Sequence, residues 1–317
     1  MRTVFTIGEA LIDFIPHQKG GGLKEVDSFR KAAGGAPANV ACAVAKLGGR
    51  SSFIGKLGAD AFGDFLVETM EQVGVDTRYV FRTSEANTAL AFVSLKADGN
   101  REFSFYRNPS ADMLLEESEI AGEWFGEGDI LHFCSVDLIE APVKYAHRKA
   151  IALAKAAGAV VSFDPNVRLP LWPDRESCRQ TILEFLPHSH IVKISDEELA
   201  YITGHADEQT AIDSLFVGDV QHVVYTRGPL GAVWYARDFS VSVPGQRVAA
   251  IDTTGAGDAF VGSLLSRLAE KPAFARGIDE ASAREMLAFA NKAAAITVTR
   301  TGAIDSLPTM GEIERFR

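Results

Sequence analysis

The feature that most constrains this chain is a repeated alternation between short β-branched runs and longer helical patterns that end at glycine. The predicted strands are Val4–Ile7, Asp129–Phe133, Val160–Asp164, His190–Ile194 and Val220–Thr226. The predicted helices are Pro37–Leu47, Ala61–Val73, Pro142–Ala157 and Asp196–Thr203, each followed by glycine. Strands that are apolar throughout are typical of a sheet covered on both faces. We therefore expect an α/β fold with a mostly parallel central sheet between helices.

Two stretches break this rhythm. Apolar and polar side chains alternate along Thr88–Lys96 and again along Arg101–Arg107, and Asp98-Gly99 between them is a strong hairpin signal. Ala10–Phe29 is also strand-like and interrupted by glycine. We expect an antiparallel flap built from segments of about residues 10–32 and 86–110. No Pro/Ser-rich or charged linker divides the sequence, which predicts a single domain spanning residues 1–317.

Composition narrows the functional classes. The 317 residues are 47% hydrophobic, which is enough to bury a large core without metals or disulfides. A net charge of −10 disfavours nucleic acid and anionic membranes as partners, although it allows a small phosphorylated ligand. The three cysteines lack any CxxC spacing, and the first residues do not form a signal peptide. These features predict a cytoplasmic protein without a membrane anchor.

The sharpest chemical signal is the string DTTGAGDAF, Asp252–Phe260. The small residues Gly255, Ala256 and Gly257 let backbone amides approach a ligand, and the apolar run Phe260–Leu268 that follows is helical. A glycine-rich turn at a helix N-terminus attracts anions through free N–H groups and the helix dipole. Asp258, in the first turn, can accept a hydroxyl proton while the amides hold a phosphoryl group. We expect an anion hole beside a general base.

A second glycine motif, GGAPAN, opens the helix predicted at Pro37–Leu47. Asn39 offers a donor and an acceptor, which suits a neutral polyhydroxyl ligand, although local backbone capping explains it equally well. Competing phosphate motifs fail. Gly55-Lys56 is followed by Leu57, and Arg50 stands where a Walker A loop needs its first glycine. The first strand is followed by no GxGxxG, which disfavours a dinucleotide-dependent oxidoreductase.

Taken together, Gly34–Gly48 and Asp252–Phe260 resemble the two signatures of the ribokinase/PfkB-type carbohydrate kinases, in the same order and separation. The resemblance extends over essentially the whole chain and implies a ribokinase-like α/β fold with a small β-lid over the sugar. It implies ATP-dependent phosphoryl transfer to a sugar hydroxyl. The positions that match the family's sugar-binding residues are Asp13, Gly34, Gly35, Asn39, Phe105, Arg107 and Arg168.

The resemblance also implies a nucleotide site. Thr226-Arg-Gly-Pro-Leu-Gly231 is similar to the family's phosphate- and ribose-binding loop. The family's Asn-x-x-Glu element, which orders water around Mg²⁺, keeps Glu198 but has Ser195 in place of Asn, and Lys193 offers a substitute phosphate contact. The matching ATP positions are Lys193, Ser195, Glu198, Thr226, Gly228, Gly231, Gly257 and Asn291. A monovalent cation, K⁺, is implied at Asp252, Thr254, Thr297, Arg300, Gly302 and Ser306.

The sugar itself is narrowed by two segments. Arg101–Asp112 and Asp164–Trp172 look most like fructokinases, which implies phosphorylation of fructose at the 6-hydroxyl. The rival substrates are 2-keto-3-deoxygluconate and aminoimidazole riboside. Arg107 and Arg168 could bind the carboxylate of 2-keto-3-deoxygluconate. Acids at Asp13 and Asp112 disfavour the anionic sugar. A catalytically inactive sugar sensor stays as an alternative of another class, and the oligomeric state stays open between monomer and homodimer.

Overall fold

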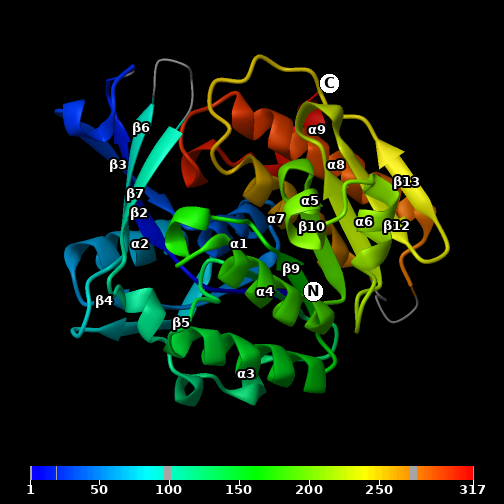
Figure 1. Ribbon diagram of the computed structural model, residues 1–317, viewed down its shortest axis with the longest axis horizontal. Helices are drawn as coiled ribbons and strands as arrows, with labels where there is room; N and C mark the ends of the chain where they lie inside the picture. The colour runs from blue at the N-terminus through cyan, green and yellow to red at the C-terminus, as the bar shows by residue number, and fades with distance from the viewer. Residues whose placement is uncertain (1, 19, 96–100, 272–276, 317) are drawn as a thin grey trace.

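The computed structural model describes residues 2–18, 20–95, 101–271 and 277–316. Within these ranges the central sheet has nine strands in the order β13-β12-β11-β10-β9-β8-β1-β4-β5 (Figure 1). Their bounds are β1 Thr3–Ile7, β4 Arg50–Gly58, β5 Asp76–Thr83, β8 Ile130–Cys134, β9 Val160–Asp164, β10 Ile191–Ser195, β11 His222–Thr226, β12 Ala232–Ala236 and β13 Ser240–Val243. The strands from β11 to β5 pair in parallel, and β12 and β13 add antiparallel strands at one edge. The expected mostly parallel sheet is confirmed.

Helices cover both faces of this sheet, as Figure 1 shows. Their bounds are α1 Ala36–Lys46, α2 Ala61–Gln72, α3 Pro142–Ala156, α4 Arg175–Phe185, α5 Asp196–Thr203, α6 Glu208–Ser214, α7 Ala256–Glu270, α8 Glu280–Val298 and α9 Met310–Arg315. Apolar side chains of α3, α4, α5 and α6 pack on one face of the sheet. Those of α1, α7 and α8 pack on the other. Coverage of both faces explains why the strands are apolar throughout rather than alternating.

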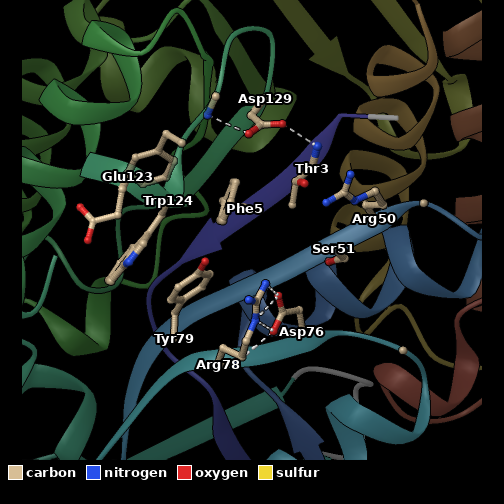
Figure 2. Close-up of a pocket in the computed structure, with 14 residues that line it drawn as sticks. Thr3, Phe5, Arg50, Ser51, Asp76, Arg78, Tyr79, Glu123, Trp124 and Asp129 are labelled. Carbon is tan, nitrogen blue, oxygen red and sulfur yellow. Dashed lines mark hydrogen bonds and ion pairs between the residues drawn. The ribbon is translucent and has the colours of Figure 1, made fainter. Parts of the chain in front are cut away.

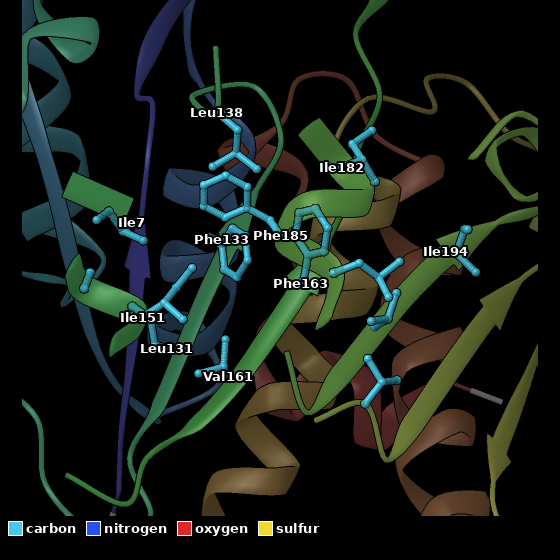
Figure 3. Packing of buried hydrophobic residues seen from close by; sticks show 14 of the residues in the cluster. Ile7, Leu131, Phe133, Leu138, Ile151, Val161, Phe163, Ile182, Phe185 and Ile194 are labelled. Atoms are coloured by element: carbon cyan, nitrogen blue, oxygen red, sulfur yellow. The ribbon is translucent and has the colours of Figure 1, made fainter. Parts of the chain in front are cut away.

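The core on the α3–α6 face contains a cluster of aromatic rings (Figure 3). Phe133 of β8 and Phe163 of β9 stack with ring centroids 4.5 Å apart, and Phe185 of α4 meets Phe133 edge-on at 6.2 Å. All three are essentially inaccessible to solvent. Burial of each such side chain contributes about 1.5–3 kcal/mol. This packing fixes β8 and β9 relative to one another, and their carboxyl ends lead into the site described below.

A second, four-stranded sheet in the order β3-β2-β6-β7 stands beside the central sheet (Figure 1). Its strands are β2 Leu11–Pro16, β3 Phe29–Gly34, β6 Leu90–Leu95 and β7 Arg101–Tyr106. It falls in the two segments expected for the flap, although the Asp98-Gly99 turn lies outside the described residues. The expectation of an antiparallel flap is wrong at one pairing, because β2 and β6 are parallel. The chain passes through β3, α1, β4, α2 and β5 between them, so β2 and β6 are not joined by a hairpin turn that would make them antiparallel.

The strands and helices predicted for the central α/β core differ from the observed ones by one or two residues at their ends. Helix α7, Ala256–Glu270, extends the predicted helical run Phe260–Leu268 at both ends, and Asp258 lies in its first turn as predicted. The three cysteines are buried and free. Among the described residues, no helix is long and apolar enough to cross a bilayer.

Candidate active site

A cavity of about 780 Å³ opens at the carboxyl ends of the central parallel strands. Its walls include Glu9 beyond β1, Val136 beyond β8, Asp164 at the end of β9 and Ser195 at the end of β10. This edge is where open α/β sheets bind ligands. The predicted site residues that line the cavity are Asp13, Gly35, Asn39, Phe105, Arg168, Lys193, Ser195, Glu198, Thr254, Gly255, Gly257 and Asp258.

The glycine-rich turn before α7 forms one wall of this cavity. Gly255 is the N-cap and adopts φ +75°, where an added Cβ would lie 3.2 Å from the Ala303 Cα. Only glycine adopts this backbone conformation without strain. The turn presents the first-turn amides of Gly257 and Asp258, which have no intrahelical acceptor. The positive end of the α7 dipole therefore faces the cavity, as expected for an anion hole.

Asp258 lies in the same first turn and is only 9% exposed. Its Oδ2 accepts a hydrogen bond of 2.7 Å from Asn39 Nδ2, which comes from the start of α1. Burial raises the pKa of the Asp258 carboxyl above its ordinary value, while the Asn39 hydrogen bond opposes the rise. A carboxylate with a raised pKa beside an anion-binding turn has the properties of a general base.

The Gly34-Gly35 pair brings the start of α1 close to two acidic residues. A Cβ on Gly34 would lie 2.2 Å from Asp13 Oδ2, and a Cβ on Gly35, at φ +100°, would lie 2.5 Å from the Glu9 carbonyl oxygen. The missing side chains therefore make room for the Asp13 carboxylate, which lines the cavity from β2. Gly34 itself does not line the cavity, and supports it from behind Asp13.

Lys193 and Asp164 form a buried ion pair beside the anion-binding turn. Lys193 Nζ lies 3.1 Å from Asp164 Oδ2, and 3.9 Å from where a Cβ on Gly257 would stand. Burial raises the pKa of Asp164 to about 6, against the attraction of Lys193. Burial works against the Lys193 cation, but the neighbouring carboxylates raise the pKa of its ammonium. The pair places a permanent positive charge where a phosphoryl group at the α7 turn would meet it.

Glu198 ties the start of α5 to the loop that follows β9. Its Oε1 accepts the Val167 N–H at 2.8 Å, and its Oε2 accepts the Ser195 N–H at 3.0 Å and the Ser195 hydroxyl at 2.7 Å. The loop holds Asn166 at φ +44°, an uncommon conformation for a residue other than glycine. Arg168, exposed on this loop, attracts the Asp258 carboxylate electrostatically. Because the N–H and the hydroxyl of Ser195 both donate to Glu198, Ser195 has a structural role as the cap of α5.

Several predicted residues lie outside the cavity lining. Arg107 is buried, and its Nη2 donates to Asp112 and Asp137. Asn291 donates its side-chain amide to the carbonyls of Val243 and Pro244, both at 3.2 Å. The other predicted residues that do not line the cavity are Gly34, Thr226, Gly228, Gly231, Asp252, Ala256, Thr297, Arg300, Gly302 and Ser306. Their expected ligand contacts stay predictions.

Three cavity-lining acids were missed by the sequence reasoning, Glu9, Asp164 and Glu197. Asp164 is the last residue of β9, and Glu9 follows β1 by two positions. An acid at the carboxyl end of a buried parallel strand was the available signal, because these ends converge at one edge of the sheet.

The segment around Asp252 packs against the segment after α8. Asp252 Oδ1 accepts the Thr254 N–H at 2.9 Å and its hydroxyl at 2.7 Å, and Oδ2 accepts the Gly302 N–H at 3.2 Å. The residues expected to hold a monovalent cation therefore come from two segments that the structure places side by side. Across the described part of the chain, no cluster of three or more His, Cys, Asp or Glu could hold a metal ion. A cation here would depend on backbone carbonyls.

A second cavity of about 510 Å³ lies at the opposite, amino-terminal ends of β1, β4 and β5 (Figure 2). Tyr79 and Trp124 stack on its wall with ring centroids 4.4 Å apart. Asp129 there accepts backbone N–H groups of Thr3 and Gly126. Neither glycine motif contributes to its lining. The chemistry therefore belongs to the larger cavity.

A mixed α/β sheet with a small second sheet, and a glycine-rich helix start facing a buried aspartate, define the chain as a ribokinase-like carbohydrate kinase. The family model described as "pfkB family carbohydrate kinase" matches residues 1–310. The chain belongs to the pfkB family of carbohydrate kinases.

Curated relatives and solved structures of similar proteins match nearly the whole length of this chain. The chain is 48% identical over 311 residues to fructokinase-1 of Zea mays, covering 98% of this chain and 96% of the relative. A fructokinase from Xylella fastidiosa with bound ATP superposes with a TM-score of 0.91 at 40% identity, covering 99% and 97% of the two chains. A double-mutant fructokinase from Vibrio cholerae O395, with fructose, ADP and potassium ion bound, gives 0.89 at 35%, covering 100% and 98%.

The buried charge of Asp258 predicts a pH-dependent cost in stability. Its folded-state pKa is raised above the unfolded value, so the folded protein loses stability as the pH rises through that pKa. We expect Asp258→Asn to raise the free energy of unfolding by about 1 kcal/mol at about pH 8. The gain should shrink towards zero as the pH falls to about 3, where the carboxyl group is mainly protonated in the unfolded state as well.

Urea unfolding at both pH values measures this difference. Asp238→Asn is the matched control, because Asp238 is exposed at the surface. A gain that is equal at both pH values would contradict the assignment of a raised pKa to Asp258.

Proposed function

We propose that this protein transfers the γ-phosphoryl group of ATP to the 6-hydroxyl of fructose. The observation that carries the proposal is the Asn39–Asp258 hydrogen bond of 2.7 Å, which joins the two glycine-rich helix starts in one cavity. In this proposal, the base, the anion-binding turn and the sugar-binding residues act on one sugar hydroxyl bound in that cavity. The fructokinase relatives, which are similar over nearly the whole chain, support the choice of sugar.

The residues divide into three roles in this proposal. Asp258 accepts the proton of the attacking hydroxyl, and the amides of the Gly255–Gly257 turn stabilise the charge that develops on the phosphoryl oxygens. Asp13, Asn39 and Phe105 contact the sugar, with the polar groups accepting and donating hydrogen bonds to its hydroxyls. Arg168 and Lys193 supply positive charge to the transferring group. Both glycines and the base are intact, which disfavours an inactive sugar sensor.

The nucleotide would enter from the side of β10 and β11. The loop after β11 holds Gly228 at φ +49° and Gly231 at φ +94°, and a Cβ on Gly231 would lie 2.2 Å from the Val243 carbonyl oxygen. Mg²⁺ fits near Asp164 and Glu198, since carboxylate oxygens are its preferred protein ligands and both residues line the cavity. When bound it would neutralise negative charge on the phosphates. We propose Thr226, Ser195 and Asn291 as further nucleotide contacts.

The preference for fructose over 2-keto-3-deoxygluconate follows from charge. Arg107, which could have received a sugar carboxylate, is already held by Asp112 and Asp137. Asp13 lines the cavity as an additional acid. Acids near a ligand carboxylate repel it, whereas they accept hydrogen bonds from a neutral sugar.

Replacement of the base tests the mechanism. We expect Asp258→Asn to lower kcat roughly 10²–10⁴-fold, because removal of a general base costs this much, while ATP binding is kept. Steady-state kinetics and calorimetric titration with ATP measure the two effects. Full turnover in the variant would contradict the assignment of Asp258 as the base.

The choice of sugar has its own test. Wild-type kcat/KM should be compared for fructose, 2-keto-3-deoxygluconate, ribose and aminoimidazole riboside, and we expect fructose to be preferred. A rival sugar preferred over fructose by about tenfold would overturn the proposed substrate.

A monovalent cation is proposed between the segments around Asp252 and Gly302. Asp252 already joins them, because its Oδ2 accepts the Gly302 N–H while its Oδ1 accepts two hydrogen bonds from Thr254, so a K⁺ ion bound by neighbouring carbonyls would stiffen the anion-binding turn. We expect Mg²⁺-dependent activity to rise when K⁺ replaces a tetraalkylammonium ion at constant ionic strength. Initial rates in the two buffers measure the effect. Equal rates would exclude the cation from the mechanism.

The small sheet is proposed to act as a lid over the sugar. Side chains alternate between its faces: Leu11, Asp13 and Phe105 line the cavity, whereas Phe14 and Phe92 stack on the other face with centroids 4.7 Å apart.

The face of the small sheet that points away from the cavity is proposed to bind a second copy of the chain. Tyr106 on that face is 62% exposed, and we propose that the second copy covers it.

Sugar binding should slow hydrogen exchange in β6 and β7, because closure excludes water from the cavity. Exchange measured by mass spectrometry with and without fructose tests the lid, and sedimentation velocity tests the dimer. Unchanged exchange in both strands would mean that the lid is preformed.

A further inference from the structure

We propose that Glu9 is a positioning residue: by accepting the first amide of α1, it holds Asn39 where Asn39 can donate to Asp258. Glu9 acts on the base through the helix, and not by contact with the reacting atoms. The inference deepens the proposed function and rests on it, since Asp258 is the proposed base.

The start of α1 has no cap from its own segment. The N-cap residue is Gly35, which offers no side chain, and Pro37 at the second helical position has no N–H. A first-turn amide that is buried needs an acceptor, and Ala36 is only 9% exposed. Glu9 supplies this acceptor from beyond β1, because its Oε1 accepts the Ala36 N–H at 3.0 Å. The helix is therefore capped by a residue distant in sequence.

The segment on the other side of this cap belongs to the small sheet. Only Gly35 separates the end of β3 from α1, and only Ala10 separates Glu9 from β2. Gly35 adopts φ +100°, and a Cβ on it would lie 2.5 Å from the Glu9 carbonyl oxygen and 2.8 Å from the Ala10 Cα. The bond between Glu9 and the Ala36 N–H therefore closes the base of the β2–β3 pair where both strands leave the core. It ties α1 directly to the segment after β1.

The capped turn contains the residue that contacts the base. Asn39 lies in this first turn, and its N–H donates to the Gly35 carbonyl at 2.8 Å. Its Nδ2 donates to Asp258 Oδ2 at 2.7 Å. A shift of the first turn of α1 would therefore move the amide that holds the carboxylate. Misplacement of reacting groups by about 1 Å can cost about 10²-fold in rate.

The hydrogen bond to Ala36 requires the oxygen of Glu9 and not its charge. Glu9 is 3% exposed, and its Oε2 has no hydrogen-bond partner within the described part of the chain. Burial raises the pKa of Glu9 to about 7, so the neutral form is populated near neutral pH. Oε1 can accept the Ala36 N–H in either form. The test must therefore separate the acceptor from the charge.

A matched pair of variants makes this separation. Glu9→Gln and Glu9→Met both remove the charge and have side chains of similar length, but only Gln keeps a strong acceptor for the Ala36 N–H. We expect kcat of Glu9→Met to be about tenfold lower than kcat of Glu9→Gln, because the start of α1 loses its cap and Asn39 is displaced. The KM for ATP should agree within about twofold, since the proposed nucleotide side lies at β10 and β11.

A second comparison asks whether Glu9 acts through Asn39. In the Asn39→Ala background, Glu9→Met and Glu9→Gln should have equal kcat, because no side-chain amide remains to be positioned. The NMR resonance of the Asn39 side-chain amide gives a readout that does not depend on turnover, and its loss in Asn39→Ala assigns it. This resonance should move further from its wild-type position in Glu9→Met than in Glu9→Gln.

Thermal unfolding first establishes that each variant is folded, and Glu9→Ala, which removes the same acceptor, carries the test if Glu9→Met does not fold. Equal kcat and equal resonance positions in the Gln and Met variants would overturn the assignment. A difference in kcat that persists in the Asn39→Ala background would also overturn it, because Glu9 would then act by another route. Failure of the wild-type protein to phosphorylate fructose would instead overturn the proposed function, and the Asn39 resonance would still decide whether Glu9 positions this amide.

Discussion

The hydrogen bond between Asn39 and Asp258 is the interaction on which the site depends. It joins two residues 219 positions apart, each in the first turn of a helix that begins at a glycine-rich motif. Both helices pack on the same face of the central sheet, so their starts meet only if the sheet and that face are correctly assembled. Correct packing of α1 and α7 therefore also places the Asp258 carboxylate correctly in the cavity.

Charge burial is the second constraint on the architecture. Glu9, Asp164 and Asp258 are all buried near the cavity, and burial raises the pKa of each. Each acid has a partner that limits this cost: the Ala36 N–H, the Lys193 ammonium and the Asn39 amide respectively. Partners of this kind are required because an unpaired buried charge destabilises a protein strongly. The stability lost at the site is offset by cores such as the Phe133–Phe163 stack.

Local sequence predicted what depends on local chemistry. The alternation of apolar strands and glycine-terminated helices was sufficient for the class of sheet and for β1, β8, β9, β10 and β11, and DTTGAGDAF was sufficient for a glycine turn with Asp258 in the first turn of a helix. Strands with weak local signals escaped: β4 begins with Arg50-Ser51-Ser52, and its burial comes from neighbours distant in sequence. The parallel pairing of β2 with β6 also escaped, since it depends on the path of the chain through the core.

The sequence by itself determined the fold class, the family signatures and the residue types at the base and the anion-binding turn, because backbone conformation and capping depend on near neighbours. The tertiary structure decided which charges meet. Arg107 pairs with Asp112 and Asp137, Lys193 pairs with Asp164, and Glu198 caps α5 through Ser195. Electrostatic pairing depends on distance in space and on burial, and neither is written in the order of the residues.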